Sequence, residues 1–224
     1  TAIILAVVLT FFFSQGFKSD ANKSPLIVKA YKSTTDLCIV TVHDSEVAEN
    51  VFEGNRELRD GLDEKLSRFK DYKVEKGKAV SPDATTQEIL SVAKKLNAEY
   101  VLQVSTNNEK ERINAKLLNV NEGRNFWSKT LRQNDIVGNG DFIDEATGLI
   151  AAHIAGHDGA IHRDILAKAL VKNEEGLQPI GLLQLGKNVW EEQTEDVTVK
   201  GTKYLERCIE LNPDISTAYA ILSE

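Results

Sequence analysis

The sequence lacks the short motifs on which many enzymes depend. It has two cysteines, Cys38 and Cys208, and no CxxC pair, which excludes zinc ribbons and dithiol redox motifs. GxSxG, GxxxxGK[ST] and GxGxxG are all missing, so the chain has no nucleophile elbow, P-loop or dinucleotide fingerprint. No residue can be assigned as nucleophile or general base. We therefore expect no enzyme and no cofactor within these 224 residues.

Clusters of basic residues are missing as well. The net charge is -7, and phosphate backbones favour surfaces where lysine and arginine gather. Nucleic acid is therefore not an expected partner of these residues. A hydrophobic content of 42% with 27% charged residues suits a folded domain with a smaller appendage. Because cysteine is so sparse, buried free thiols are favoured over the alternative, a disulfide between Cys38 and Cys208 in an oxidising compartment.

The first seventeen residues, TAIILAVVLTFFFSQGF, carry no charge. A membrane-spanning helix needs about 20 apolar residues, and the basic start and cleavage site of a signal peptide are not seen here. Because the chain begins at Thr1, we expect a fragment or processed product, with a partial transmembrane helix over 1–17 and a tether over 18–36. Lysines in the tether favour a cytoplasmic side only weakly, so the side of the membrane stays open at this point.

The spacing of apolar residues predicts a mixed α/β domain over 37–171. LCIVTV, for example, is a short β-branched run typical of a buried strand. Thr85 with Glu88 forms a capping box at the start of a helix, and Gly61 inside another helix indicates close packing there. The element order β-α-β-α-β-β-β-α describes a mixed sheet with flanking helices. Strands are expected at 37–42, 72–78, 100–106, 112–120 and 125–131, and helices at 46–69, 85–98 and 141–171.

The last part of the chain, residues 172–224, changes character. YLERCIELNPDISTAY resembles a tetratricopeptide repeat, with Asn212-Pro213-Asp214 as the turn between helices. GLLQLGKNVW, over 181–190, would supply the first helix of the pair. We therefore predict an all-α hairpin that starts a truncated repeat region. Further repeats are expected to follow, because a single repeat cannot bury its own apolar face.

Taken in order, the motifs of residues 37–169 resemble the TolB-like amino-terminal domain of bacterial regulators. Three segments carry the resemblance: LRDGLDEKLSRFKDYKV (58–74), EILSVAKKLNAEYVLQVS (88–105) and INAKLLNVNEGRNFWSKTLRQ (113–133). Such domains are found in CadC-type membrane-anchored winged-helix transcriptional regulators and in certain class III adenylate cyclases. A tetratricopeptide region after the domain is the arrangement of that family.

The resemblance implies a non-enzymatic segment that receives a signal and binds a protein. It would belong to an inner-membrane regulator whose DNA-binding domain precedes residue 1, with the soluble part in the periplasm. Residues 1–17 would contact the membrane, and a protein partner would bind the repeat region. The alternative is an accessory segment of a class III adenylate cyclase whose catalytic domain lies upstream. The sequence that precedes Thr1 would distinguish the two.

Three of the four histidines lie in AAHIAGHDGAIHRD, residues 151–164. His153 and His157 have the spacing of a helical zinc pair, and His162 or Asp158 would be a third ligand. However, the position of a zinc protease's general base is Ile154, and two glycines flank His157. GHDGAI is also similar to a short linker of the TolB-like family. We favour a helix break over a metal site or a membrane-tethered metallohydrolase.

Two other groups invite a functional interpretation. Trp127 would suit a stacking platform for bases or sugars, but the strand alternation around it favours packing in the sheet. Asp60, Asp63 and Glu64 lie among arginines and lysines, which indicates a solvated helix face with ion pairs. Neither group is predicted to be a site.

Overall fold

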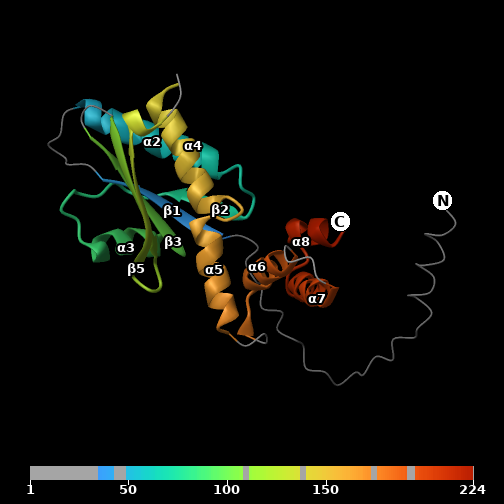
Figure 1. Ribbon diagram of the computed structural model, residues 1–224. Coiled ribbons are helices and arrows are strands. Elements are labelled where there is room, and N and C mark those ends of the chain that lie inside the picture. The colour runs from blue at the N-terminus through green and yellow to red at the C-terminus, as the bar shows by residue number, and fades with distance from the viewer. Residues whose placement is uncertain are drawn as a thin grey trace, which may run out of the picture. The chain divides into compact units, whose positions relative to one another are not determined.

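The computed structural model describes residues 35–42, 49–107, 111–136, 140–172, 176–190 and 195–223 (Figure 1). The predicted membrane span and nearly all of the predicted tether lie outside this part of the chain. Within it, no helix is both long and apolar enough to cross a membrane.

Five strands form one mixed sheet in the order β2-β1-β3-β4-β5. The inner strand β1 pairs in parallel with β2 and with β3, and the chain then runs back and forth through β3, β4 and β5 as an antiparallel meander. The strands are β1 (Thr35–Thr41), β2 (Tyr72–Lys76), β3 (Tyr100–Thr106), β4 (Arg112–Asn119) and β5 (Arg124–Arg132). This architecture confirms the mixed α/β fold that the alternating patterns predict.

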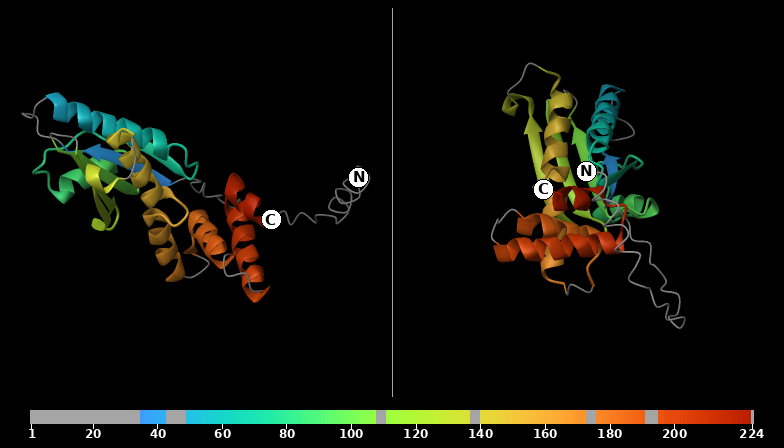
Figure 2. Two further views of the ribbon diagram at one scale, coloured as in Figure 1. Left: turned by 45° about the horizontal axis from the view of Figure 1, so that its top comes forward. Right: turned by 90° about the vertical axis from the view of Figure 1, so that its right-hand side faces the viewer.

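Helices cover both faces of the sheet (Figure 2). One face packs against α2 (Glu49–Leu66) and α4 (Phe142–Ala155), where the apolar stripe of α2 meets β1, β3 and β4 in the main core. The other face packs against α3 (Thr86–Lys95) in a smaller core. A short 3-10 turn, η1 (Gln133–Asp135), follows β5.

Two local details of the helices are confirmed. The side chain of Thr85 accepts from the backbone of Glu88, whose carboxylate in turn accepts from the backbone of Thr85, which is the capping box. A Cβ added at Gly61 would lie 3.2 Å from Cγ2 of Thr147 on α4. The missing side chain at Gly61 therefore allows the close approach of α2 and α4.

The remaining helices form a third core. They are α5 (Ala160–Leu170), α6 (Pro179–Trp190), α7 (Glu195–Leu211) and α8 (Ser216–Leu222). Gly186 on α6 faces Leu205 on α7, and an added Cβ would lie 2.6 Å from its Cδ2. Cys208 is fully buried here, and its thiol donates to the carbonyl of Pro179 at 3.2 Å. Both cysteines are buried free thiols. The assignment of α6 and α7 to a tetratricopeptide repeat stays a prediction.

Most element boundaries differ from the expected ones by one to three residues, and two differences have a clear physical reason. Strand β1 begins at Thr35, two residues before the predicted 37, because the backbone amide of Thr35 already bonds the carbonyl of Asp71 at 2.8 Å. The predicted helical region 141–171 is two helices, α4 and α5, separated at residues 156–159. Gly156 and Gly159 cause this break, and the break determines where the histidines lie.

Candidate functional site

The two glycines of the histidine stretch end α4 and begin α5. Gly156 leaves the helix with φ -61° and ψ 175°, and a Cβ there would lie 2.4 Å from the carbonyl oxygen of Ala152. At Gly159 a Cβ would lie 2.5 Å from the carbonyl oxygen of Ile154. Larger residues cannot occupy these positions without movement of the backbone. His153 and His157 are therefore not on one helix, as the predicted break requires.

The three histidines occupy different environments. His153 is exposed on α4 with Nδ1 2.6 Å from the carbonyl oxygen of Leu149, and His157 is exposed in the break. His162 is buried on α5, with Nδ1 2.8 Å and 3.0 Å from the carbonyl oxygens of Gly156 and His157. In the described ranges, no three histidine, cysteine or acidic side chains are grouped so that they could hold a metal ion. The structure brings only His157 and His162 to a common small pocket.

A buried carboxylate, Asp164, joins α5 to the end of the sheet. Its side chain is 5% exposed and accepts hydrogen bonds from the hydroxyl of Tyr100 at 2.9 Å and from Nδ2 of Asn119 at 3.3 Å. These two donors are a directly opposed pair, at the start of β3 and the end of β4. A buried charge is tolerated only when it is paired and hydrogen-bonded, and two cations complete this requirement.

The two cations are Lys168, one helical turn along α5, and Arg124 at the start of β5. Lys168 binds Asp164 and also lies 2.9 Å from the exposed Glu122, while a nitrogen of Arg124 lies 3.1 Å from Asp164. Burial by itself would raise the pKa of Asp164, but the hydrogen bonds from Lys168 and Tyr100 hold it below the usual value. Asp164 therefore stays ionised and ties three strands to α5.

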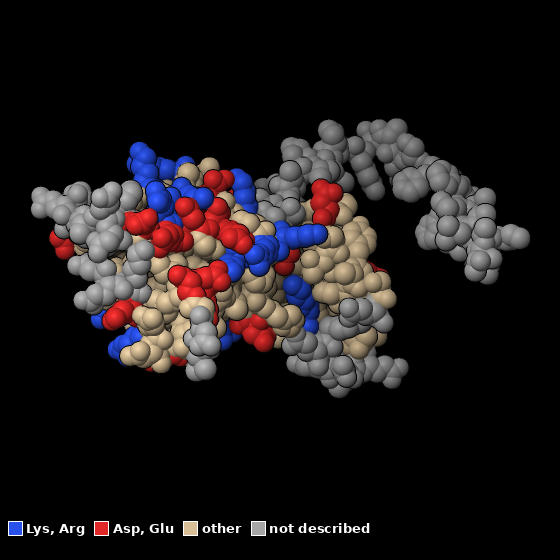
Figure 3. Space-filling model, turned by 90° about the horizontal axis from the view of Figure 1, so that it is seen from above, with Lys and Arg blue, Asp and Glu red and all other residues tan. Residues whose placement is uncertain are grey.

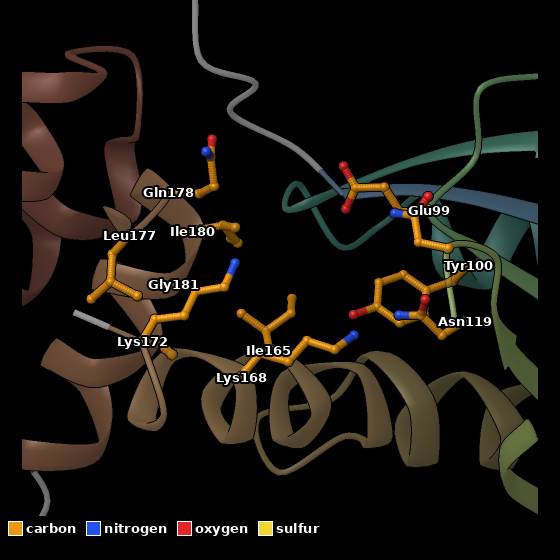
Figure 4. Close-up of a pocket in the computed structure, with 12 residues that line it drawn as sticks. Glu99, Tyr100, Asn119, Ile165, Lys168, Lys172, Leu177, Gln178, Ile180 and Gly181 are labelled. Carbon is orange, nitrogen blue, oxygen red and sulfur yellow. The ribbon is translucent and has the colours of Figure 1, made fainter. Parts of the chain in front are cut away.

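Next to this network lies a pocket of about 260 Å³, between the end of the sheet and α6. Lys168 and Lys172 extend into it from the end of α5, Glu99 and Tyr100 lie on the side of the sheet, and Gln178 and Ile180 lie on the side of α6 (Figure 4). The lining thus combines two cations, a carboxylate, a phenol, three amides and aliphatic side chains. Polar groups that converge on a pocket in this way can fix the orientation of a bound small molecule.

The other groups singled out in the sequence are structural. Trp127 is half-buried on β5 opposite Leu117 and packs against the main core, as its strand position predicts. The acids on α2 form ion pairs, and Lys76 lies 3.2 Å from Asp60 and 3.0 Å from Asp63. Positive and negative side chains are interspersed over the face seen in Figure 3. This distribution fits the solvated face that the charge pattern predicts.

The Asp164 network and the pocket beside it are not predicted from the sequence. Asp164 stands in the histidine stretch, but its partners Tyr100, Asn119 and Arg124 lie far from it in the sequence. One usable signal was present, because Tyr100 begins a strand and Asn119 ends the next one. An antiparallel pair places those two residues at the same end of the sheet.

The comparisons with known proteins leave the family open. No protein-family model and no curated protein matches the chain. Among solved structures, the PelC dodecamer from Paraburkholderia phytofirmans is similar, with a TM-score of 0.34 and 14% identity over 57% of this chain and 89% of that chain. TolB from Acinetobacter baumannii has a TM-score of 0.33 and 14% identity over 58% of this chain and 30% of that chain. The likeness to TolB is weak, and TM-scores this low carry no argument about function.

Proposed function

We propose that the chain is a non-enzymatic signal-input and protein-interaction segment of a membrane-anchored bacterial regulator. The observation that carries the proposal is the pocket of about 260 Å³ between the sheet and α6. A small molecule bound there would contact Tyr100 on β3 and Gln178 at the start of α6 together. A ligand that binds one arrangement of sheet and helices more tightly than another would shift the protein towards that arrangement. A difference of this kind in affinity is what transmission of a signal requires.

The polar groups around the pocket support a binding role. The carboxylate of Asp164 is held by four donors, and Lys168 is shared between Asp164 and Glu122. These bonds hold Asp164 and Lys168 in fixed positions, so the side of the pocket beside them is rigid. Lys172, at the end of α5, is an exposed cation on the pocket's lining and would contact an anionic group of the ligand.

The rest of the proposed arrangement follows the resemblance to TolB-like regulators. Residues 1–17 anchor the protein in the inner membrane, and the residues after them lie in the periplasm. A winged-helix DNA-binding domain precedes residue 1, and residues 172–224 begin the repeats that bind a protein partner. The half-exposed Tyr219 on α8 (47% exposed) supplies an aromatic side chain to that surface.

The test fills the pocket in the full-length regulator. A Cβ at Gly181 would make only ordinary contacts, 3.6 Å from Cβ of Ala169 and 3.8 Å from Cδ2 of Leu177, so a larger side chain there extends into the pocket. The matched control is Gly148→Leu on α4, where an added Cβ meets no atom within 4 Å. Gly181→Leu should abolish the regulated change in transcription, measured by transcript profiling in the native bacterium, and Gly148→Leu should preserve it.

Circular dichroism and thermal unfolding must show both variants folded for this comparison. A Gly181→Leu protein that is folded and regulates transcription like wild type would contradict the role of the pocket. The interaction part is tested by capture of a partner on the full-length protein. A tight small-molecule ligand together with consistent failure to capture any protein would refute the repeat region as a docking surface.

A further inference from the structure

A second, smaller pocket of about 50 Å³ lies where the break between α4 and α5 meets α6. His162 and Arg163 line it from α5, Gln184 and Lys187 line it from α6, and the exposed Asp158 lines it from the break. A cavity needs about 10–15 Å³ to hold one water molecule, so this pocket has room for a few waters or one small ion.

Three buried side-chain atoms have no hydrogen-bond partner among the described residues, and two of them belong to side chains that line this pocket. They are Nε2 of His162 and Nε2 of Gln184, on side chains whose residues are 7% and 5% exposed. The third is the hydroxyl of Tyr72, whose ring centroid lies 5.8 Å from that of His162. Buried polar groups are nearly always hydrogen-bonded, so three unpartnered atoms in one region indicate that a bound group belongs there.

The hydrogen bonds of His162 determine what that group must offer. Its Nδ1 faces two carbonyl oxygens, those of Gly156 and His157, which accept but cannot donate. Nδ1 therefore carries the proton of the neutral ring, and Nε2 is a bare acceptor. Gln184 presents a donor, its amide nitrogen. The bound group must both donate a hydrogen and accept one.

The charges around the pocket favour an anion. The pKa of His162 is lowered, first by burial and next by the positive charge of Lys187, while the negative charge of Asp71 opposes this less strongly. Asp71 itself lies 3.8 Å from Lys187. Arg163 and Asp158 add one charge of each sign to the lining, and both residues are exposed and so largely screened by water, which leaves Lys187 as the less exposed charge beside His162.

We propose that this pocket binds one small oxyanion that carries a hydrogen, of the size of bicarbonate. Its hydroxyl donates to Nε2 of His162, and its other oxygens accept from Gln184 and from the cations at Lys187 and Arg163. The anion thereby links α5 to α6 at a place separate from the larger pocket. The proposal does not depend on the function proposed above.

Nitrate is the matched probe, because it has nearly the size and the same charge as bicarbonate but no hydrogen to donate. The experiment titrates the full chain with ¹³C-labelled bicarbonate or with nitrate at equal ionic strength and about pH 8, where a histidine is neutral. We expect saturable bicarbonate binding, by NMR line broadening and by a rise in Tm. Nitrate should bind at least about tenfold more weakly, because it leaves Nε2 of His162 unpaired.

The variant His162→Asn keeps a donor near the position of Nδ1 and removes the acceptor Nε2. His153→Asn makes the same chemical change on α4, where the exposed ring also contacts a carbonyl oxygen through Nδ1 but lies outside the pocket. His162→Asn should lose at least about tenfold in bicarbonate affinity, the effect of one buried hydrogen bond, and His153→Asn should bind like wild type.

Three results would overturn the proposal. They are equal binding of nitrate and bicarbonate, equal loss in the two variants, and no saturable binding of bicarbonate at all, which would leave buried water as the occupant. If His162→Asn does not fold, the ¹⁵N shift of Nε2 in the wild-type His162 ring decides. That shift should move towards the hydrogen-bonded value as bicarbonate is added, and a shift that does not change refutes the site.

Discussion

Removal of the Asp164 carboxylate should destabilise the protein more than any exposed charge substitution in the same network. In Asp164→Ala, the hydroxyl of Tyr100 and the amide of Asn119 lose their acceptor inside the protein, since both residues are buried. An unsatisfied buried donor costs about 1–3 kcal/mol, so the two together predict a loss of about 2–6 kcal/mol in the free energy of unfolding. That is a large share of the roughly 5–15 kcal/mol typical of a domain.

The matched control is Glu122→Gln. Glu122 binds Lys168 at 2.9 Å and Arg124 at 3.0 Å, the same two cations that bind Asp164, but its side chain is 38% exposed. An exposed pair contributes at most about 1 kcal/mol, so this variant should stay close to wild type. Urea unfolding followed by circular dichroism measures both free energies. A cost of Asp164→Ala no greater than that of Glu122→Gln would refute the argument.

The same carboxylate predicts how stability depends on acidity. Because the folded state holds the pKa of Asp164 below its usual value, the unfolded chain binds its proton more readily. The stabilisation is fully present above the unfolded pKa of about 3.9 and is lost as the pH falls through the lower folded pKa. The difference in unfolding free energy between wild type and Asp164→Asn should therefore be constant near neutral pH and shrink below about pH 4. A difference that grows towards acid would contradict the assigned direction.

Further predictions concern the glycines and histidines. Gly186→Ala should cost about 1–2 kcal/mol by urea unfolding, because its Cβ would lie 2.6 Å from the fully buried Leu205; an unchanged midpoint would mean that α6 and α7 separate easily. Gly148→Ala should instead stabilise by about 0.5–1 kcal/mol, since the added carbon meets open space inside a helix. Zinc should leave Tm unchanged both in wild type and in the His153→Ala, His157→Ala double variant; a zinc-dependent rise confined to wild type would restore the metal interpretation.

The sheet and its helices could be predicted because their signals are local. Of the run LCIVTV, residues 37–41 are buried on β1, and Val42, directly after the strand, is half-buried. The pair Thr85 and Glu88 caps α3, as the spacing of these two residues predicts. The close packing at Gly61 was also readable, because a glycine inside a helix costs stability unless something approaches it. Boundaries were less exact, since strand β1 extends to Thr35 through a bond with Asp71, a residue the local pattern does not contain.

The candidate sites could be predicted only where the deciding feature was also local. The break in the histidine stretch followed from Gly156 and Gly159, and no long-range information was needed. The Asp164 network depends instead on where three strands end relative to α5, and no spacing in the sequence encodes that meeting. The same holds for Gln184, which an apolar helix pattern marks as an ordinary polar interruption.

The histidine stretch illustrates why residue type alone misleads. Two imidazoles four residues apart suggest a shared ligand, but the backbone between them turns away from the helix and leaves His153 and His157 exposed at separate places. The third, His162, is buried, its Nδ1 contacts two carbonyl oxygens, and its Nε2 has no partner among the described residues. A ring fixed in this way has one acceptor to satisfy, and the donor must come from outside its own helix. The chemistry of this segment therefore depends on what fills the pocket against α6, and the hydrogen on the bound group decides which ions are accepted.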